Sequence, residues 1–275
     1  MTAYRKNSKG QALVLVLLAL AVVLTIVLYI LSRSITDISV SSNESEAASA
    51  FSAAEAGVEQ ALVIGVGGSS TVGSASYTSQ VTNVAQSVTG FVYPVDLNSG
   101  DSMTLWLKSR DTSPSFTGSS LKICWGKTGE YSDQNLIPAI ETVLFYETVA
   151  DTPSTARIYR AAFDPNAGRR AENSFAAPGG SCTIDGQSFQ FQATLDLSGI
   201  PNPQFVFVKM FYNTDTNHPV AFDSTDAHLF PTQGMLISSL GVAAQSSRKV
   251  EVFQGWPEIP SSFQFAIYSS TGLTK

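Results

Sequence analysis

The hydrophobic residues of the chain are concentrated first in one uninterrupted run near the N-terminus. From Ala12 to Leu31 the sequence consists of Leu, Val, Ala and Ile, with Thr25 and Tyr29 as its polar interruptions. At about 1.5 Å per residue this run reaches roughly the ~30 Å of a bilayer's hydrocarbon core. The pattern therefore predicts a membrane-spanning helix over residues 12–31.

A secretory signal peptide is the main alternative, because it also has basic residues before an apolar run. Its apolar region is usually about 7–15 residues long and ends in a small-residue cleavage site. Here the run is longer, and the residues after it, Ser32 to Asp37, contain no Ala-x-Ala pattern. The sequence favours a retained helix over cleavage after the run.

The charges on the two sides of the run predict its orientation. Arg5, Lys6 and Lys9 precede it, whereas the acidic residues Asp37 and Glu44 follow soon after Arg33. Basic residues favour the cytoplasmic side. We therefore expect a single pass through the inner or cytoplasmic membrane, with the N-terminus in the cytoplasm and the rest exported.

Helical spacing continues beyond the membrane run, without Pro and without Gly before Gly57. We predict one helix over residues 11–63, which would be roughly 80 Å long. Small residues at 54–57 allow another helix or a sheet to approach closely. The apolar stripe is expected to pack on the chain's own globular domain, with an intermolecular helix bundle as the alternative. Its members are Leu31, Ile35, Ile38, Ala47, Phe51, Ala54, Val58 and Leu62.

Glycine and serine then predict the end of the helix. Residues 64–76 contain Gly65, Gly67, Gly68 and Gly73 among several serines, and no helix tolerates so many. We interpret 64–76 as a linker. Residues 77–275 are then enough for one exported domain with a sizeable core.

Period-two alternation predicts that this domain is built of β-strands. The clearest runs are 103–107, 121–125 and 189–197, and segments 140–149 and 204–212 are apolar on both faces, as in central strands. Further strands are expected at 235–244, 248–254 and 262–268, the last two joined by a Pro-containing connection. The loops are expected at 111–120, 164–186 and 213–226. The predicted fold class is α+β, a long N-terminal helix followed by an antiparallel, sandwich-like β domain.

Charge and cysteine content limit the classes of binding partner and bear on the compartment of the protein. The chain has 16 basic and 22 acidic residues, a formal net charge of −6, and no basic run, so nucleic-acid binding is not expected. Cys124 and Cys182 are its two cysteines, both in the portion expected to be exported. A disulfide between them and two separately buried thiols are the alternatives. Neither residue belongs to a CxxC pair.

Candidate chemistry is sparse. His218 and His228 lie in an acidic loop with Asp215, Asp223 and Asp226, which are weak candidates for a loose calcium site or, less readily, zinc. The helical calcium-loop motif fails, and a solvated surface loop is the simpler interpretation. There is no Gly-x-Ser-x-Gly elbow and no phosphate-binding loop. We expect no enzymatic activity and no cofactor.

The N-terminal residues Lys9-Gly10-Gln11-Ala12-Leu13-Val14-Leu15 resemble the leader and apolar segment of type IV pilins and type II secretion pseudopilins. The stretch Ala54-Glu55-Ala56-Gly57 is similar to that of PilX-type minor pilins. This resemblance implies a leader over residues 1–10, cleavage between Gly10 and Gln11 by a prepilin peptidase, and N-methylation. Gln11 departs from the frequent Phe or Met. Leu15 stands where major pilins carry Glu, as in certain minor, tip-located subunits.

Two functions follow as hypotheses. The first is a minor pilin or pseudopilin, a structural subunit that joins other pilin-like subunits through its N-terminal helix in a surface filament. The second is an uncleaved, membrane-anchored binding module for a glycan or a protein, with Trp125 or Trp256 as contact residues. An anchored hydrolase would need an aligned His–carboxylate pair in a cleft.

Overall fold

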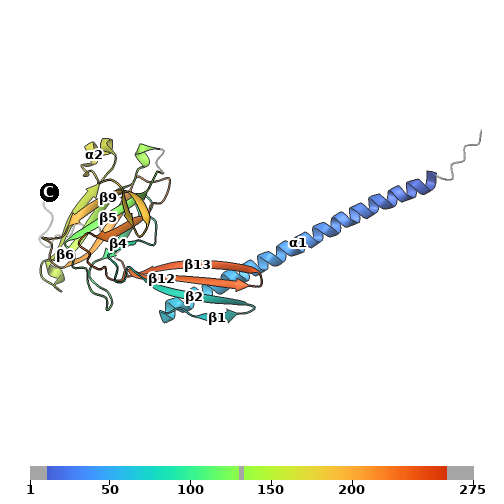
Figure 1. Cartoon of the computed structure of the whole chain (residues 1–275), viewed down its shortest axis with the longest axis horizontal. Coiled ribbons are helices and arrows are strands. Elements are labelled where there is room, and N and C mark those ends of the chain that lie inside the picture. The colour runs from blue at the N-terminus through green and yellow to red at the C-terminus, as the bar shows by residue number, and fades with distance from the viewer. Residues whose placement is uncertain (1–10, 130–132, 259–275) are drawn as a thin grey trace, which may run out of the picture. The chain divides into compact units, whose positions relative to one another are not determined.

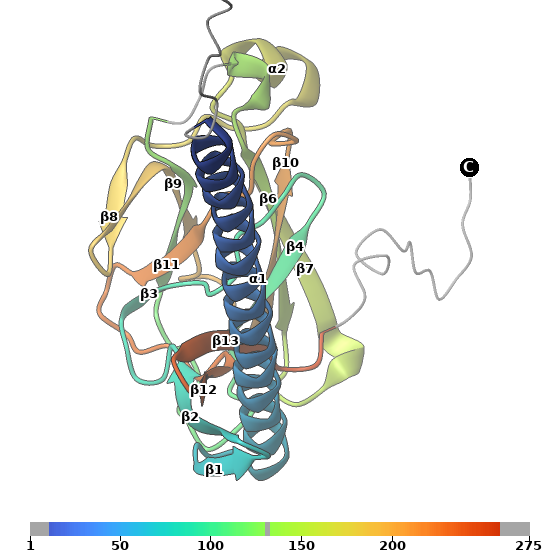
Figure 2. The same cartoon turned by 90° about the vertical axis from the view of Figure 1, so that its right-hand side faces the viewer.

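The computed structural model describes residues 11–129 and 133–258, and the side chains from residue 13 onward. Figures 1 and 2 label many of its helices and strands. The chain divides into two compact units. The helix unit contains the residues up to 80 together with 238–251, and the sandwich unit contains 81–237 together with the residues from 252 onward.

One long helix dominates the helix unit, as the sequence predicts. Helix α1 runs over Gln11–Ile64, 54 residues, one residue longer than expected. It ends at Gly65, whose φ of 77° lies in the left-handed region and whose N–H donates to the Ala61 carbonyl. Glycine adopts this conformation at no steric cost, which explains why the helix stops there.

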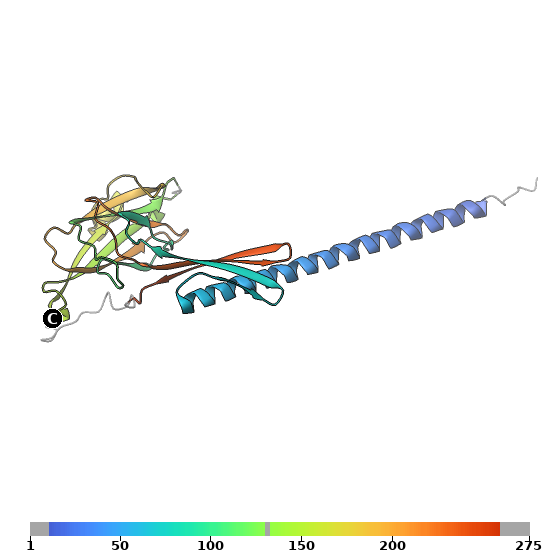
Figure 3. The same ribbon diagram turned by 60° about the horizontal axis from the view of Figure 1, so that its bottom comes forward.

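The last turns of α1 pack on a four-stranded sheet with the order β1-β2-β12-β13, and Figure 3 shows the helix beside these strands. The strands are β1 (Ser69–Val72), β2 (Ala75–Val84), β12 (Gly234–Ala243) and β13 (Ser246–Gly255). Their inward side chains in this unit include Ala75, Tyr77 and Ala243.

Glycines on both sides bring the helix and the sheet unusually close together. A Cβ placed on Gly241 of β12 would lie 1.9 Å from the Ala50 carbonyl oxygen, and one on Gly57 would lie 2.3 Å from Ser239 Oγ. The buried helix stripe is made of small residues, namely Ala50, Ala53, Ala54, Gly57 and Ala61, with Val58 beside them. Packing of the helix against the chain's own sheet, the first of the two expected modes, is thus present.

Two details of the sequence prediction are wrong. Phe51 and Leu62, expected in the buried stripe, are 45% and 36% exposed, whereas the buried positions hold alanines, Gly57 and Val58. Residues 64–76, expected to be a linker, contain β1 and a turn that pairs it with β2, Ser69 opposite Thr78 and Val72 opposite Ala75. Gly73, with a φ of 60°, occupies the turn between these strands, and Gly67 lets the chain approach the Ser79 backbone closely.

The sandwich unit contains two antiparallel sheets, of orders β4-β10-β6-β7 and β3-β11-β5-β9-β8. Figure 2 shows them as two layers. The first sheet comprises β4 (Ser102–Trp106), β10 (Pro203–Phe211), β6 (Ala139–Glu147) and β7 (Ala156–Phe163). The second comprises β3 (Gly90–Val92), β11 (Val220–Ser224), β5 (Ser120–Lys127), β9 (Gln187–Asp196) and β8 (Cys182–Ile184).

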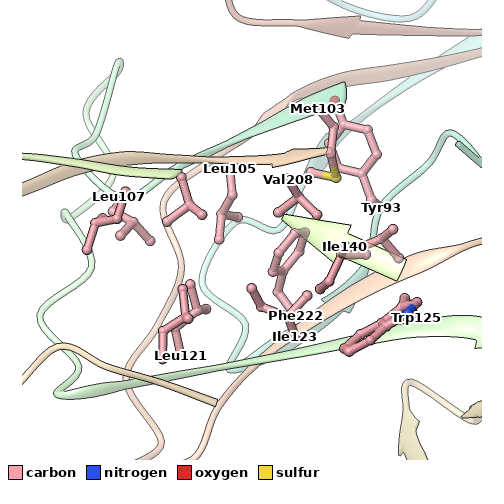
Figure 4. Close-up of a cluster of buried hydrophobic side chains, with 14 of the residues drawn as sticks. Tyr93, Met103, Leu105, Leu107, Leu121, Ile123, Trp125, Ile140, Val208 and Phe222 are labelled. Carbon is pink, nitrogen blue, oxygen red and sulfur yellow. The ribbon is translucent and has the colours of Figure 1, made fainter. Parts of the chain in front are cut away.

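The main core lies between these sheets. Met103, Leu105 and Leu107 face Leu121 and its neighbours, as Figure 4 shows. The alternation that predicted strands at 103–107, 121–125 and 189–197 therefore also gave their buried faces correctly. Trp125 is fully buried here and donates its Nε1–H to the Pro138 carbonyl at 2.9 Å.

Other elements were not predicted. Strands β2, β3, β7 and β8 were missed, β11 lies in the expected loop 213–226, and helix α2 (Ala167–Asn173) lies in the expected loop 164–186. The short helices η1 (Gln134–Leu136) and η2 (Pro153–Thr155) complete the fold. The expected strand at 262–268 lies outside the described residues. Strand β13 instead forms a hairpin with β12 through a turn at Ala244, whose φ is 47°.

Candidate functional site

The first part of α1 is a fully exposed apolar rod. Its large hydrophobic side chains from Leu13 to Leu31 are 44–66% exposed, all round the helix. The most apolar 18-residue window has a mean hydropathy of 3.2 with none of it buried. Helix α1 is thus long and apolar enough to span a membrane. A helix that is hydrophobic on every face needs lipid or other protein around it.

The polar interruptions of this rod are satisfied locally. The Thr25 hydroxyl donates to the Val22 carbonyl at 2.8 Å, a bond that a threonine makes within its own helix. Leu15 is 66% exposed and adds no carboxylate to the rod. The predicted processing position, Gly10, lies outside the described residues. Gln11 is the first residue of the helix.

Between the rod and the sheet-packed part, α1 is also uncovered. Residues 32–45 are exposed, and Ile35 and Ile38 are 69% and 68% exposed. Thr36 donates its hydroxyl to the Ser32 carbonyl at 3.0 Å. This stretch lies beyond the predicted membrane span, so its isoleucines are apolar side chains that neither the predicted span nor the described chain covers.

Cys124 of β5 and Cys182 of β8 form a disulfide, the first of the two alternatives weighed from the sequence. In a flat sheet, strands β5 and β8, with β9 between them, would lie about 9.6 Å apart. The two Cα atoms are 6.4 Å apart, so the sheet curls, and β8 also contacts β3 and β11. A small second cluster of Cys124, Ile184, Phe189 and Ala221 lies beneath the bond. A disulfide fits an exported, oxidising compartment.

The three aspartates considered for calcium are not brought together. The described residues hold no group of three or more His, Cys, Asp or Glu side chains placed to bind a metal. Asp223 pairs with Lys122 Nζ at 2.7 Å, and Asp215 is exposed. Asp226 accepts hydrogen bonds from Ser224 Oγ at 2.6 Å and from Ser119 N at 2.6 Å.

These bonds stabilise the charged form of Asp226. The Ser224 hydroxyl and then the Ser119 backbone N–H lower the pKa of its carboxyl to about 2. Its two oxygens are engaged in holding the loop after β11 against the start of β5. We interpret Asp226 as a structural residue of this loop.

His228 lies near Asp226 without a hydrogen bond between the two side chains. His228 Nδ1 lies 2.9 Å from Thr117 Oγ1, but its Nε2 is 3.9 Å from Asp226, beyond hydrogen-bond length. His218 is buried, and its Nδ1 accepts the Lys127 N–H at 3.2 Å. The base–carboxylate hydrogen bond of a Ser–His–Asp triad is therefore missing at His228.

An open cleft of about 530 Å³ lies near Thr117 and Ser119 in the sandwich unit. Several of its polar side chains are already bonded within the protein: Ser119 to Asp226, Asn202 to the Glu147 carbonyl, and Lys108 to Asp151. These side chains therefore take part in the protein's own hydrogen bonds.

Comparisons of the chain with protein-family models, with curated proteins and with solved structures find no match. The findings on the molecule itself are an N-terminal helix able to span a membrane, an antiparallel β domain, and a disulfide that fits export.

Proposed function

We propose that the protein is a structural subunit, a minor pilin or pseudopilin, that is inserted in the cytoplasmic membrane and incorporated through α1 into a type IV pilus or a type II secretion-like filament. The proposal includes removal of residues 1–10 by a prepilin peptidase, N-methylation of Gln11, and export of everything after Arg33. It does not include an enzymatic role.

The length and exposure of α1 are the observation that carries this proposal. Its 54 residues reach roughly 81 Å, whereas a bilayer core is about 30 Å thick. A simple anchor needs only the bilayer length. Residues 32–45 extend the helix by about 21 Å with exposed isoleucines, which a bundle of similar helices would cover.

The exposed rod explains how one helix serves two environments. Before assembly, lipid surrounds its apolar side chains, and after assembly the helices of neighbouring subunits take the place of lipid. A head-to-tail contact that does not close produces a helical filament. Leu15 leaves the rod without the costly buried carboxylate of the major subunits, which favours a minor subunit.

The processing step gives the first test. In cells that contain a prepilin peptidase, we expect N-terminal sequencing of the membrane-extracted protein to start at Gln11. The variant Gly10→Val should retain Met1, and the leader variant Asn7→Ala, which keeps Gly10, should still be processed. An intact Met1 in the unaltered protein, or cleavage beyond Leu31, would contradict the proposal.

Assembly gives the second test. A photo-reactive amino acid at Ile35 should cross-link to the helix of another pilin-like subunit in intact cells. The same residue in the Gly10→Val background should give no such product, because the unprocessed chain stays in lipid. Cross-linking that is equal in both backgrounds, or a retained leader with no filament association, would instead favour the membrane-anchored binding module.

A further inference from the structure

The sheet β4-β10-β6-β7 carries a second apolar face, on the side away from the main core. Its residues are Trp106, Val143, Phe145, Phe205 and Phe207, which we call the aromatic face. The register places them side by side, with Phe205 opposite both Trp106 and Phe145 and Phe207 opposite Val143. They therefore form two cross-strand rows over three strands.

Close ring contacts hold this face together. The Phe145 and Phe205 rings stack with centroids 4.6 Å apart, and Phe207 meets Phe145 edge-on at 5.7 Å. Trp106 lies 5.1 Å from Phe205 and has the Arg110 guanidinium over its ring. Rings in these geometries attract one another beyond simple burial. The face is thus a well-formed apolar surface and not a scatter of single residues.

Most of the aromatic face is buried, although it lies outside the main core. Trp106, Val143, Phe205 and Phe207 are only 2–8% exposed. Ile158, opposite Phe145 on the edge strand β7 and on the same face, is 52% exposed. The cover therefore extends over β4, β10 and β6 and stops before β7. Of the described residues outside the sheet, the hydrophobic side chain packed on this cluster is Trp256.

The residues after β13 reach the aromatic face at its β4 side. After β13 ends, Trp256 donates its Nε1–H to the Thr232 carbonyl at 2.8 Å, which fixes the indole. Two residues later, the Glu258 carboxyl interacts with Thr104, the β4 residue opposite Phe207. Burial raises the pKa of Glu258. The last described residues thus lie at the margin of the aromatic face.

The residues after Glu258 have a composition that suits packing on an apolar surface. From Ile259 to Thr274 the sequence has no charged side chain, and Phe263, Phe265 and Ile267 alternate with Gln264 and Ala266. Alternation at period two places the three apolar side chains on one side of an extended segment. Ten extended residues reach about 33 Å, whereas three strand spacings amount to about 14 Å.

We propose that the segment from Ile259 onward crosses the aromatic face of its own chain, with Phe263, Phe265 and Ile267 directed onto Phe205, Phe207 and their neighbours. The segment lies outside the described residues, and the proposal does not depend on the function proposed above. Because Trp256 is packed on the face and held by the Thr232 carbonyl, the segment that follows is present there at an effective concentration of the order of millimolar, which favours it over a free partner.

Photo-cross-linking of the full chain in detergent tests the occupant directly. With p-benzoylphenylalanine at Phe265, mass spectrometry should find intrachain cross-links to residues 143–145 or 203–207, in a yield that does not change on tenfold dilution. Cross-links to another chain, or to other parts of the same chain, would overturn the proposal. The matched probe at Gln264, on the opposite side of the segment, should give far fewer cross-links to this face.

Tryptophan fluorescence gives a second, independent measure. Trp106 and Trp256 lie at the face, whereas Trp125 is in the main core. In the full-length variant Phe263→Ser/Phe265→Ser, acrylamide quenching of tryptophan fluorescence should rise about two-fold, because two of three indoles lose their cover. The control Gln264→Ser should quench like the unaltered protein. Equal quenching in all three proteins would show that something other than this segment covers the face.

Discussion

The two halves of α1 differ in what covers their side chains. From Leu13 to Leu31 most side chains are large and apolar, and they are exposed on every face of the helix. In the part packed on the chain's own sheet, the buried residues are alanines, Gly57 and Val58, whereas the larger Phe51 and Leu62 are exposed. Residue size therefore distinguishes two surfaces of the helix. Large apolar residues are found where lipid or another protein would cover it, and small residues are found where the chain's own sheet does.

The same distinction applies to the β-sheets. The curled edge of the five-stranded sheet covers its own small cluster and is held by the Cys124–Cys182 bond, whereas Trp256 is the described hydrophobic side chain outside the other sheet that packs on its aromatic face. A contact within the chain can be removed by one local substitution, and its loss is measured as a lower free energy of unfolding. A contact with lipid or with another protein is instead detected from the location of the protein in the cell.

The largest effect on stability is expected at the disulfide, which is a covalent contact within the chain. Replacing both cysteines, Cys124→Ala/Cys182→Ala, should lower the free energy of unfolding of the sandwich unit by about 4 kcal/mol, because the bond closes a loop of 58 residues. Urea unfolding followed by the fluorescence of the buried Trp125 measures this loss. The neighbouring exposed variant Ser181→Ala should unfold like the unaltered protein. Unchanged unfolding of the double variant would mean that packing alone holds the curled edge.

The next effect concerns the half of α1 that has no internal cover. Leu20→Arg places a charge near the middle of the predicted span and should disfavour membrane insertion by about 3 kcal/mol. The fraction of protein that resists alkaline extraction from membranes should fall accordingly. Ile38→Arg, equally exposed on the same helix but beyond the span, should stay in the membrane fraction. Equal extraction of the two variants would remove the difference between these parts of α1.

A smaller effect is expected at the contact between helix and sheet. Gly241→Ala puts a Cβ against the Ala50 backbone, and overpacking of this kind costs about 1–3 kcal/mol. Hydrogen exchange of the amides in residues 50–61 should become faster. Gly180→Ala, at a position with no atom within 4 Å of the new Cβ, should leave exchange unchanged. If the two variants exchange alike, the close approach does not stabilise this half of the helix.

The sequence predicted those parts of the fold whose pattern is local. The apolar run gave α1 to within one residue of its end, and the alternation of Met103, Leu105 and Leu107 gave both a strand and its buried face. Strand β7 was missed because Ala156–Phe163 lies at a sheet edge and does not alternate. Strand β11 is short and lies within a polar loop, where local pattern favours a turn.

The close contact between Gly57 and β12 lay beyond the reach of sequence pattern. Ser239 and Gly241 are nearly two hundred residues further along the chain, so nothing local pairs them with the helix. The small residues at 54–57 did indicate a close approach, but not which face of the helix would be buried. The aromatic face was hidden likewise, because strands 140–149 and 204–212 were interpreted only as apolar on both sides.

The smallest effect is expected at Asp226, whose carboxylate accepts hydrogen bonds from nearby polar groups. The pKa of its carboxyl in the folded protein, about 2, lies below the ordinary value of 3.8, so ionised Asp226 stabilises the fold above about pH 4, and this contribution is lost as the pH falls towards 2. Asp226→Asn should therefore melt below the unaltered protein at pH 6, with the difference shrinking between pH 4 and pH 2 in calorimetry. Asp215→Asn, at an exposed position, should match the unaltered protein throughout. A difference for Asp226→Asn that stays constant down to pH 2 would show that the loop is held by the geometry of its hydrogen bonds and not by the charge.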